Sequence, residues 1–336
     1  MKVLGVNAGN GVLVHPFKKW LIGNIELRGV FGTPGNIQWK LNFGDIPLVN
    51  KLKDINQLPD FTGVDIILSH PDCGHSSILA YSRAKKFGNA QENKSLNLFF
   101  LAIQRYKPKL FLMENLTALI DNFGLEGLMQ GLSKYNLVFH NVSVSEFGNS
   151  QKNRKRLILI GIRKDQPKFI TKVFGNVYQL NEPKPSSLLI GHLPDYDFEL
   201  LHVRENLSDI ITLYAGYKDV IDNIRIEWTT IRMNENRWKV TGRNFSTAPG
   251  VYKNRAFDYP ATVRPTNRQF NHNGLMMSPR ELAIIQGIPN DFALYCDTNR
   301  IKYCINKGRV TVTKTPPYEI GLWFFKQVSK IKKWLK

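Results

Sequence analysis

The chain has 336 residues, of which 43% are hydrophobic, so it can form one large α/β domain with an insert, or two domains with sizeable cores. Its formal net charge of +19 indicates a polyanionic partner such as nucleic acid, although a lysine-rich host proteome would produce the same excess. No apolar stretch reaches the roughly 20 residues of a membrane-spanning helix, so no membrane partner is expected. Three scattered cysteines are too few for a disulfide framework, which favours a reducing, cytoplasmic compartment.

The amino-terminal residues predict two strands joined by a glycine-rich turn. Residues 2–6 form an apolar run that lacks the features of a signal peptide, so we expect a strand there. Residues 7–11 read Asn-Ala-Gly-Asn-Gly, and the next apolar run, residues 20–26, ends in an acid, Glu26. The backbone at such a turn can approach a nucleoside cofactor, and an acid at the end of the second strand can bind the ribose hydroxyls.

Apolar runs and helical spacings then alternate along the chain as far as residue 162. Helices are predicted over residues 96–106 and 125–132, and strands over residues 64–68, 110–113, 138–144 and 157–162. Strands that alternate with helices are typical of a mostly parallel, doubly wound sheet. The predicted fold class is therefore α/β.

The pattern changes between about residues 166 and 259, where the hydrophobic periodicity weakens. Residues 225–260 hold seven basic side chains against three acids, with aromatic residues interleaved. Basic and aromatic groups together suit phosphate contact and base stacking. The aromatic residues fit better as the small core of an irregular domain, whereas four cations are expected to face nucleic acid: Arg232, Arg237, Lys239 and Arg243.

Helical order returns after residue 259. Ser278, Pro279 and Glu281 combine an N-cap serine, a proline at the first helical position and a capping-box glutamate, which predicts a helix that ends at Gly287. Residues 318–336 predict an amphipathic basic helix that docks on the sheet. Its candidate apolar face consists of Ile320, Trp323, Phe324, Val328, Ile331 and Trp334.

Cys73 lies just past the carboxyl end of a predicted strand, where the reacting groups of an open α/β sheet gather. Pro71 would turn its sulfur toward a cleft, and a thiolate with a lowered pKa is a strong nucleophile, although an inert buried cysteine is the alternative. His70, Cys73 and His75 are metal-ligand types, but no fourth ligand lies at a useful spacing, so no metal site is expected. Ser76 stands where a zinc nucleobase deaminase would need a second cysteine, which excludes that class.

Three further residue groups stand at predicted strand ends. Glu114 ends one strand, where a carboxylic acid can hydrogen-bond a heterocycle and pass it a proton, although such acids also cap helices. Arg154 and Arg156 open the last strand and could orient Glu114 or contact phosphate, unless they belong to a solvated charge run. Asp45 offers another acid at a third edge.

In their order and spacing, these elements resemble the DNA cytosine-5 methyltransferase family. The family's Pro-Cys, Glu-Asn-Val and Gln-x-Arg-x-Arg motifs resemble residues 71–73, 114–116 and 154–156. Its helix of the type Arg-Glu-Ala-x-x-x-Gln-Gly-Phe-Pro resembles residues 280–289, which is the most specific of these matches, and its cofactor-side aspartate motif resembles residues 44–46. The match spans most of the chain in the family's order.

The resemblance implies an S-adenosylmethionine-dependent methyltransferase that acts on duplex DNA as a monomer. It implies a Rossmann-like catalytic domain from residues 1–165 and 260–336, with a smaller target-recognition domain from residues 166–259. Cys73 would attack carbon 6 of a flipped cytosine, and Glu114 would hold ring nitrogen 3 and its proton.

By the same resemblance, Arg154 and Arg156 would position Glu114 and the base. Carbon 5 would then take the methyl group, and loss of its proton and of the thiolate would restore the aromatic ring. The residues implied to bind the cofactor are Asn7, Ala8, Gly9, Gly11, Glu26, Asp45 and Pro71.

The chain departs from the family pattern at several positions. Asn7 replaces an aromatic residue, Gly74 replaces a glutamine, Lys152 takes a glutamine's place, and the final cofactor motif is not evident near residues 313–316. Two alternatives therefore stay open: a DNA-binding relative without methyl transfer, and a thiolate enzyme that modifies carbon 5 with another donor. The altered cofactor motifs favour these two alternatives. The intact Cys73 and Glu114 favour methyl transfer and the thiolate enzyme with another donor.

Overall fold

The structure, a computed structural model, describes residues 1–27, 35–72, 94–123, 129–151, 154–184, 251–253, 268–270, 279–294 and 312–335. Several residues that the sequence singled out lie outside these ranges, namely Cys73, His75, Lys152, Arg232, Arg237, Lys239, Arg243 and Ser278. Most of the predicted target-recognition region, residues 166–259, also lies outside them. The proposed division into two domains therefore stays a prediction.

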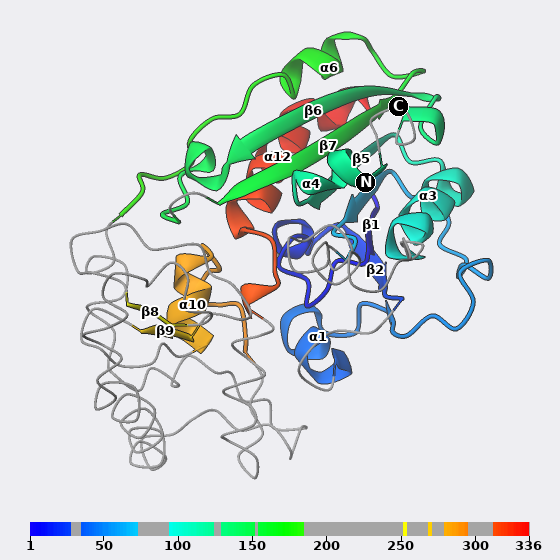
Figure 1. The fold of residues 1–336 in the computed structure, drawn as a ribbon. Helices are drawn as coiled ribbons and strands as arrows, with labels where there is room; N and C mark the ends of the chain where they lie inside the picture. The colour runs from blue at the N-terminus through cyan, green and yellow to red at the C-terminus, as the bar shows by residue number, and fades with distance from the viewer. Residues whose placement is uncertain are drawn as a thin grey trace.

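A seven-stranded sheet forms the core of the described residues, with the strand order β3-β2-β1-β4-β5-β7-β6 (Figure 1). The strands are β1 Val3–Val6, β2 Leu21–Ile25, β3 Leu48–Val49, β4 Ile66–Ser69, β5 Leu110–Asn115, β6 Tyr135–Ser143 and β7 Lys155–Arg163. Strands β1 to β5 run parallel, whereas β7 runs antiparallel to both of its neighbours, β5 and β6. The strand order reverses between β1 and β4, which is where open α/β sheets bind ligands.

The predicted mostly parallel, doubly wound α/β fold is confirmed, and the reversal of β7 has a simple cause. β6 ends at Ser143 and β7 begins at Lys155, and the short connection between them contains the 3-10 helix η3, Val144–Phe147. A parallel connection needs a crossover of about a dozen residues or more, usually with an α-helix. The chain therefore turns back, and β7 pairs with β6 on one side and β5 on the other.

Helices cover both faces of the sheet in the described part of the chain. They are α1 Gly35–Phe43, α3 Lys94–Tyr106, α4 Ala118–Phe123, α6 Phe169–Val173, α10 Pro279–Ile285 and α12 Tyr318–Ile331, with the 3-10 helices η1 His15–Phe17 and η6 Lys332–Trp334. Ile66 and Leu68 of β4 pack in the cluster that contains α12, whereas Ile67 packs in the cluster that contains α3. Burial on both faces explains why these strands read as continuous apolar runs.

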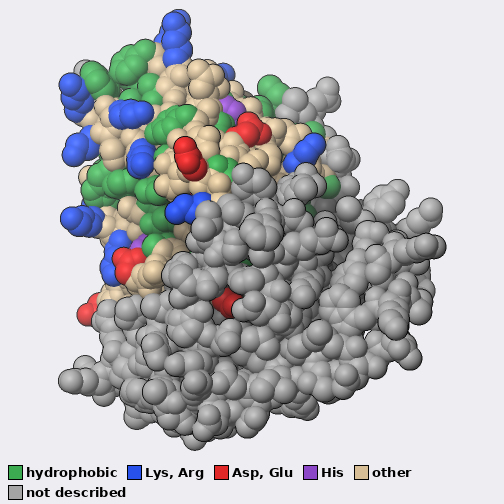
Figure 2. Space-filling model, turned by 90° about the vertical axis from the view of Figure 1, so that its left-hand side faces the viewer, with side chains coloured by type: hydrophobic (Ala, Val, Ile, Leu, Met, Phe, Trp, Pro, Cys, Tyr) green, Lys and Arg blue, Asp and Glu red, His purple; other side chains and the backbone are tan. Residues whose placement is uncertain are grey.

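A short parallel pair, β8 Val251–Lys253 and β9 Arg268–Phe270, is separate from the large sheet. Helix α12, coloured red, lies against β6 and β7 (Figure 1). The docking predicted for this helix is confirmed by the burial of Ile320, Trp323, Phe324, Val328 and Ile331. The prediction is wrong for Trp334, which lies on η6 beyond the end of α12 and is 38% exposed. No helix among the described residues is long and apolar enough to cross a membrane. Figure 2 shows Lys and Arg side chains spread over the described part of the surface in that view.

The packing of α12 gives a first testable prediction. Trp323 has no exposed surface, and its ring contacts that of Phe147 edge-on, with 5.5 Å between centroids. We expect Trp323→Ala to lower the free energy of unfolding by about 3–5 kcal/mol, because it leaves a large cavity. Trp334→Ala is the matched control and should cost about 0.5 kcal/mol. Urea unfolding curves measure both, and equal losses would contradict this account of the docking.

Candidate active site at the carboxyl edge of the sheet

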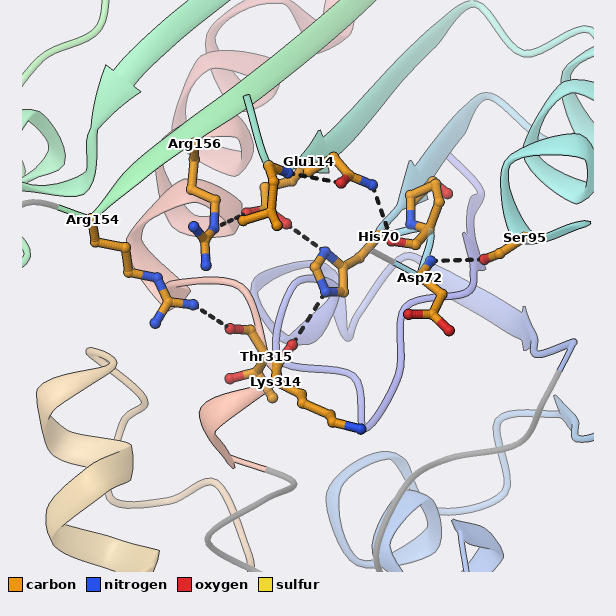
Figure 3. Close-up of polar contacts among 12 residues, drawn as sticks. His70, Asp72, Ser95, Glu114, Arg154, Arg156, Lys314 and Thr315 are labelled. Atoms are coloured by element: carbon orange, nitrogen blue, oxygen red, sulfur yellow. Dashed lines mark hydrogen bonds and ion pairs between the residues drawn. The ribbon is translucent and has the colours of Figure 1, made fainter. Parts of the chain in front are cut away.

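The topology brings several predicted site residues to one edge of the sheet. β4 and β5 are parallel neighbours that pair Ser69 with Met113, so the residues that follow, His70 and Glu114, lie side by side. β7 runs the opposite way and pairs Leu157 with Asn115, so its first residues lie at the edge where the parallel strands end. Glu114 is thereby brought close to Arg154 and Arg156, which lie at the start of β7 (Figure 3).

Glu114 is held between two basic side chains. It has no exposed surface, its Oε2 forms an ion pair with Nδ1 of His70, and its Oε1 lies 2.7 Å from Nε of Arg156. Burial alone would raise the pKa of this carboxyl, but His70 and Arg156, with Arg154, outweigh it and hold the pKa below its usual value. Glu114 is therefore kept as a carboxylate with one basic partner on each oxygen.

His70 is a site residue that the sequence analysis treated only as a metal-ligand type. Its Nε2 lies 3.2 Å from the backbone oxygen of Lys314, and its Nδ1 faces Glu114 (Figure 3). Burial lowers the pKa of the imidazole, but attraction to Glu114 outweighs burial, so the pKa rises above its usual value. The sequence signal for His70 was its position directly after a buried strand. That signal pointed to Glu114 only with the knowledge that β4 and β5 are neighbours in the sheet.

Arg154 is nearly fully buried, and its guanidinium donates hydrogen bonds to the backbone oxygen of Thr315 at 2.9 Å and to Oε1 of Gln151 at 3.0 Å. Arg156 forms the ion pair with Glu114. The two arginines therefore have different supports: Arg156 reaches the acid directly, whereas Arg154 joins the carboxyl-terminal segment to the start of β7 and acts on Glu114 through its charge.

Four further buried polar residues support Arg154, and no sequence pattern pointed to them as a group. Gln151 donates to Oε1 of Gln286 on the turn after α10 at 3.0 Å, and to Oδ1 of Asn149 at 3.1 Å. Asn149 in turn donates to Oε2 of Glu319 on α12 at 2.9 Å. Gln286 lies in the block of residues 280–289, but the partners of this network are separated by up to 170 positions in the sequence. The network ties both carboxyl-terminal helices to this edge.

The second half of the edge surrounds the ends of β1 and β2. The backbone N–H of Gly9 donates to Oε1 of Glu26 at 2.7 Å, and Nδ2 of Asn24 donates to the same oxygen at 2.8 Å. Burial raises the pKa of Glu26 to about 7, an effect that the bonds from Asn24 and Gly9 partly offset. Asn7 fixes the turn, since its side chain donates to the backbone of Ser95 at 3.0 Å and accepts from the backbone of Leu27 at 3.2 Å.

The segment that leads to Cys73 is also anchored. Nδ2 of Asn115 donates to the backbone oxygen of Pro71 at 3.1 Å, and the backbone N–H of Asp72 donates to Oγ of Ser95 at 2.9 Å. Position 73 is thus reached from a fixed chain, although Cys73 itself lies outside the described residues. Asp45 is exposed and precedes β3, so it lies on the amino-terminal side of that strand. The cofactor contact that the resemblance implies for Asp45 stays a prediction.

The glycine-rich turn fits a nucleoside-bearing group. Gly9 and Gly11 have φ values of 63° and 93°, which residues with a side chain rarely adopt. A Cβ on Gly11 would also collide with the ring of Phe43. Asn10 is only 4% exposed, yet both polar atoms of its amide lack a hydrogen-bond partner among the described residues. A buried carboxyl, an unsatisfied buried amide and an open backbone turn together form a donor and acceptor set that suits hydroxyl and amino groups. Among the described residues, no group of three or more His, Cys, Asp or Glu residues could hold a metal ion.

Comparison with known proteins gives consistent matches. The family described as C-5 cytosine-specific DNA methylase matches residues 35–307. The chain is 26% identical over 223 residues to the orphan methyltransferase M.SPRI of Bacillus phage SPR, a match that covers 60% of this chain and 46% of that relative. It is 22% identical over 270 residues to the type II methyltransferase M.Bsp6I of Bacillus sp. (strain RFL6), with 77% and 78% covered. The match to the phage protein thus spans less than half of that relative's length.

Solved structures show the same fold. A DNA modification methyltransferase encoded within an E. coli prophage has a TM-score of 0.64 at 14% identity, with 99% of each chain covered. The S. pombe Dnmt2 methyltransferase has a TM-score of 0.57 at 13% identity, with 98% of this chain and 99% of that chain covered. At these identities the likeness shows the Rossmann-like fold alone.

Glu319 predicts a pH dependence of stability. Burial raises its pKa to about 7, partly offset by hydrogen bonds from Asn149. The folded chain then binds a proton at this carboxyl more tightly than the unfolded chain, so its contribution to the free energy of unfolding falls as pH rises from about 4.5 to about 7. Glu319→Gln removes this loss. The free energy of unfolding of the variant, relative to that of wild type, should therefore rise by about 3 kcal/mol between about pH 4 and about pH 8.

Urea unfolding of both proteins across this pH range measures the effect. Glu182→Gln, at an exposed position, is the matched control and should follow the wild-type curve. A difference between Glu319→Gln and wild type that stays constant with pH would contradict the assignment.

Proposed function

The chain belongs to the C-5 cytosine-specific DNA methylase family, and on that premise we propose that it transfers a methyl group from S-adenosylmethionine to carbon 5 of cytosine in duplex DNA. The observation that carries this proposal is the buried Glu114 carboxylate, held by a basic side chain on each oxygen beside the strand that leads to Cys73. A fixed acid next to a candidate thiolate suits nucleophilic attack on a pyrimidine ring.

Each reacting residue has a defined role in this proposal. Cys73 bonds to carbon 6 of the cytosine as a thiolate, which pushes electron density into the ring and activates carbon 5. Glu114 binds ring nitrogen 3 through a proton and so stabilises that density, while Arg156 keeps the carboxyl oriented. S-adenosylmethionine supplies the methyl group. Loss of the proton from carbon 5 and departure of the thiolate then restore the aromatic ring.

The base must leave the duplex for this chemistry, because carbon 6 is not accessible to a nucleophile inside the base stack. We assign recognition of the duplex to residues 166–259, with phosphate contacts from Arg232, Arg237, Lys239 and Arg243. The net charge of +19 supports a polyanionic partner. We expect the chain to act on DNA as a monomer, with residues 1–165 and 260–336 as the catalytic domain.

The cofactor would lie at the switch point between β1 and β4, where the described residues fit it. Glu26 would accept hydrogen bonds from the ribose hydroxyls, and the turn that contains Asn7, Ala8, Gly9 and Gly11 would let the backbone approach. The unsatisfied amide of Asn10 lies in the same turn and supports this placement. Pro71 would border the site, and Asp45 would be a further cofactor contact, as the resemblance implies.

Methyl transfer tests the proposal directly. Wild type incubated with tritiated S-adenosylmethionine and mixed-sequence duplex DNA should label the DNA. Cys73→Ala should abolish labelling, and Glu114→Gln should reduce it about 10²- to 10⁴-fold, because the variant lacks the proton donor. Cys304→Ala is the control for the cysteine and should label DNA at the wild-type rate.

Other outcomes of this experiment identify the alternatives. DNA binding without label or cofactor binding would show a relative that has lost methyl transfer. A covalent adduct with 5-fluorocytosine DNA that forms only with a different donor would show a thiolate enzyme of another reaction type.

The affinity for cofactor should depend on the charge of Glu26. Because burial raises its pKa to about 7, the carboxylate that accepts hydroxyl hydrogen bonds is formed as pH rises through about 7. Binding of S-adenosylhomocysteine, measured by calorimetry, should therefore tighten between about pH 6 and about pH 8. Glu26→Gln should bind about 10-fold more weakly and without this pH dependence. Glu182→Gln, at an exposed position, is the control and should bind as wild type does, whereas equal affinities for Glu26→Gln and wild type would contradict the assignment.

A further inference from the structure

The ring of His70 lies between two oxygen acceptors. Nδ1 faces Oε2 of Glu114, and Nε2 lies 3.2 Å from the backbone oxygen of Lys314 (Figure 3). A neutral imidazole has one donor and one acceptor nitrogen, so it cannot donate to both partners. Two arrangements satisfy all the atoms: an imidazolium beside a Glu114 carboxylate, or a neutral ring that accepts a proton from the carboxyl. These arrangements differ only in the position of one proton along the contact.

We propose that His70 is the proton partner of Glu114, and that it holds on Nδ1 the proton that Glu114 passes to ring nitrogen 3 of the cytosine. This inference rests on the proposed methyl transfer and names a residue outside the motifs that suggested it. His70 acts on the base through Glu114, so it is a positioning residue that also stores the proton.

The transfer balances in two steps. When the Cys73 thiolate bonds to carbon 6, an electron pair moves toward ring nitrogen 3. The Nδ1–H bond of His70 breaks as an O–H bond forms on Glu114, and that O–H bond then breaks as an N–H bond forms on the base. His70 becomes neutral and Glu114 stays a carboxylate. When the thiolate leaves, the proton returns by the same route, so the cycle consumes no further reagent.

The surrounding charges favour this role. Arg156 holds the other oxygen of Glu114 at 2.7 Å and keeps the carboxyl in place while its proton moves. The Arg154 charge stabilises the carboxylate form of Glu114, and Glu26 on the β2 side is a further acid that interacts with His70. Arg156 opposes protonation of His70, but Glu114 and the Lys314 carbonyl favour it, and the pKa of His70 is raised in consequence. This shift favours the imidazolium form of His70 beside the Glu114 carboxylate.

The rate of methyl transfer as a function of pH tests the proposal. Single-turnover rates of wild type with tritiated S-adenosylmethionine and mixed-sequence duplex DNA should fall on the alkaline side as His70 loses its proton. His70→Asn can still donate a hydrogen bond to Glu114 but cannot give up a proton. It should react about 10²-fold more slowly, with an unchanged KM for DNA and without the alkaline decline. His70→Gln serves as a second variant if His70→Asn fails to fold, as judged by thermal unfolding.

A matched control and a second measurement separate the possible failures. His140, a partly buried histidine on β6, lies 2.7 Å from the backbone oxygen of Phe174, and His140→Asn should keep the wild-type pH profile. Titration of the histidine rings by NMR should give His70 a pKa above 6.5 that falls in Glu114→Gln. An ordinary or lowered pKa would overturn the proposal.

Two outcomes separate the role of His70 from the proposed methyl transfer. If wild type labels DNA while His70→Asn keeps both the rate and the alkaline decline of wild type, only the role of His70 is overturned. If wild type transfers no methyl group, the proposed function fails, and the role of His70 in it fails as well.

Discussion

The burial of Glu114 is the constraint on which the rest of the described site depends. A carboxylate without exposed surface is costly unless charged partners and hydrogen bonds replace its water. His70 and Arg156 supply one partner to each oxygen. One comes from the end of β4 and the other from the start of β7, so the arrangement exists only where these strands flank β5. The reversed direction of β7 is thus part of the site's chemistry as well as of its topology.

Two glutamates at the same edge illustrate how surroundings divide the roles of one residue type. Glu26 and Glu114 are both buried at strand ends, but their pKa values move in opposite directions. Glu26 has neutral donors as partners, the amide of Asn24 and the backbone of Gly9, which offset burial only in part. Glu114 has the basic groups of His70, Arg156 and Arg154, which outweigh burial. One carboxyl is therefore poised near neutrality beside the glycine-rich turn, while the other stays charged.

The carboxyl-terminal part of the chain completes this edge. Arg154 and Gln151 precede β7, and their hydrogen bonds reach Thr315 and Gln286, while Asn149 reaches Glu319 on α12. A buried polar network tolerates few alternative arrangements, because each unpaired group would lose a hydrogen bond in a medium of low dielectric constant. These bonds therefore fix where α10 and α12 meet the first half of the chain. They also explain why segments so distant in sequence belong to one folded unit.

The sequence by itself determined the local elements and the chemical types at their ends. Continuous apolar runs marked β1, β4, β5 and β7, because strands buried on both faces need no polar alternation. Glu114 and Arg156 were found because each adjoins such a run. The tertiary structure alone decided the direction of β7, the position of Asp45 before β3 and the pairing of His70 with Glu114. Periodicity reports only that a segment is buried, whereas strand direction and side-chain partners depend on connection length and on packing between distant segments.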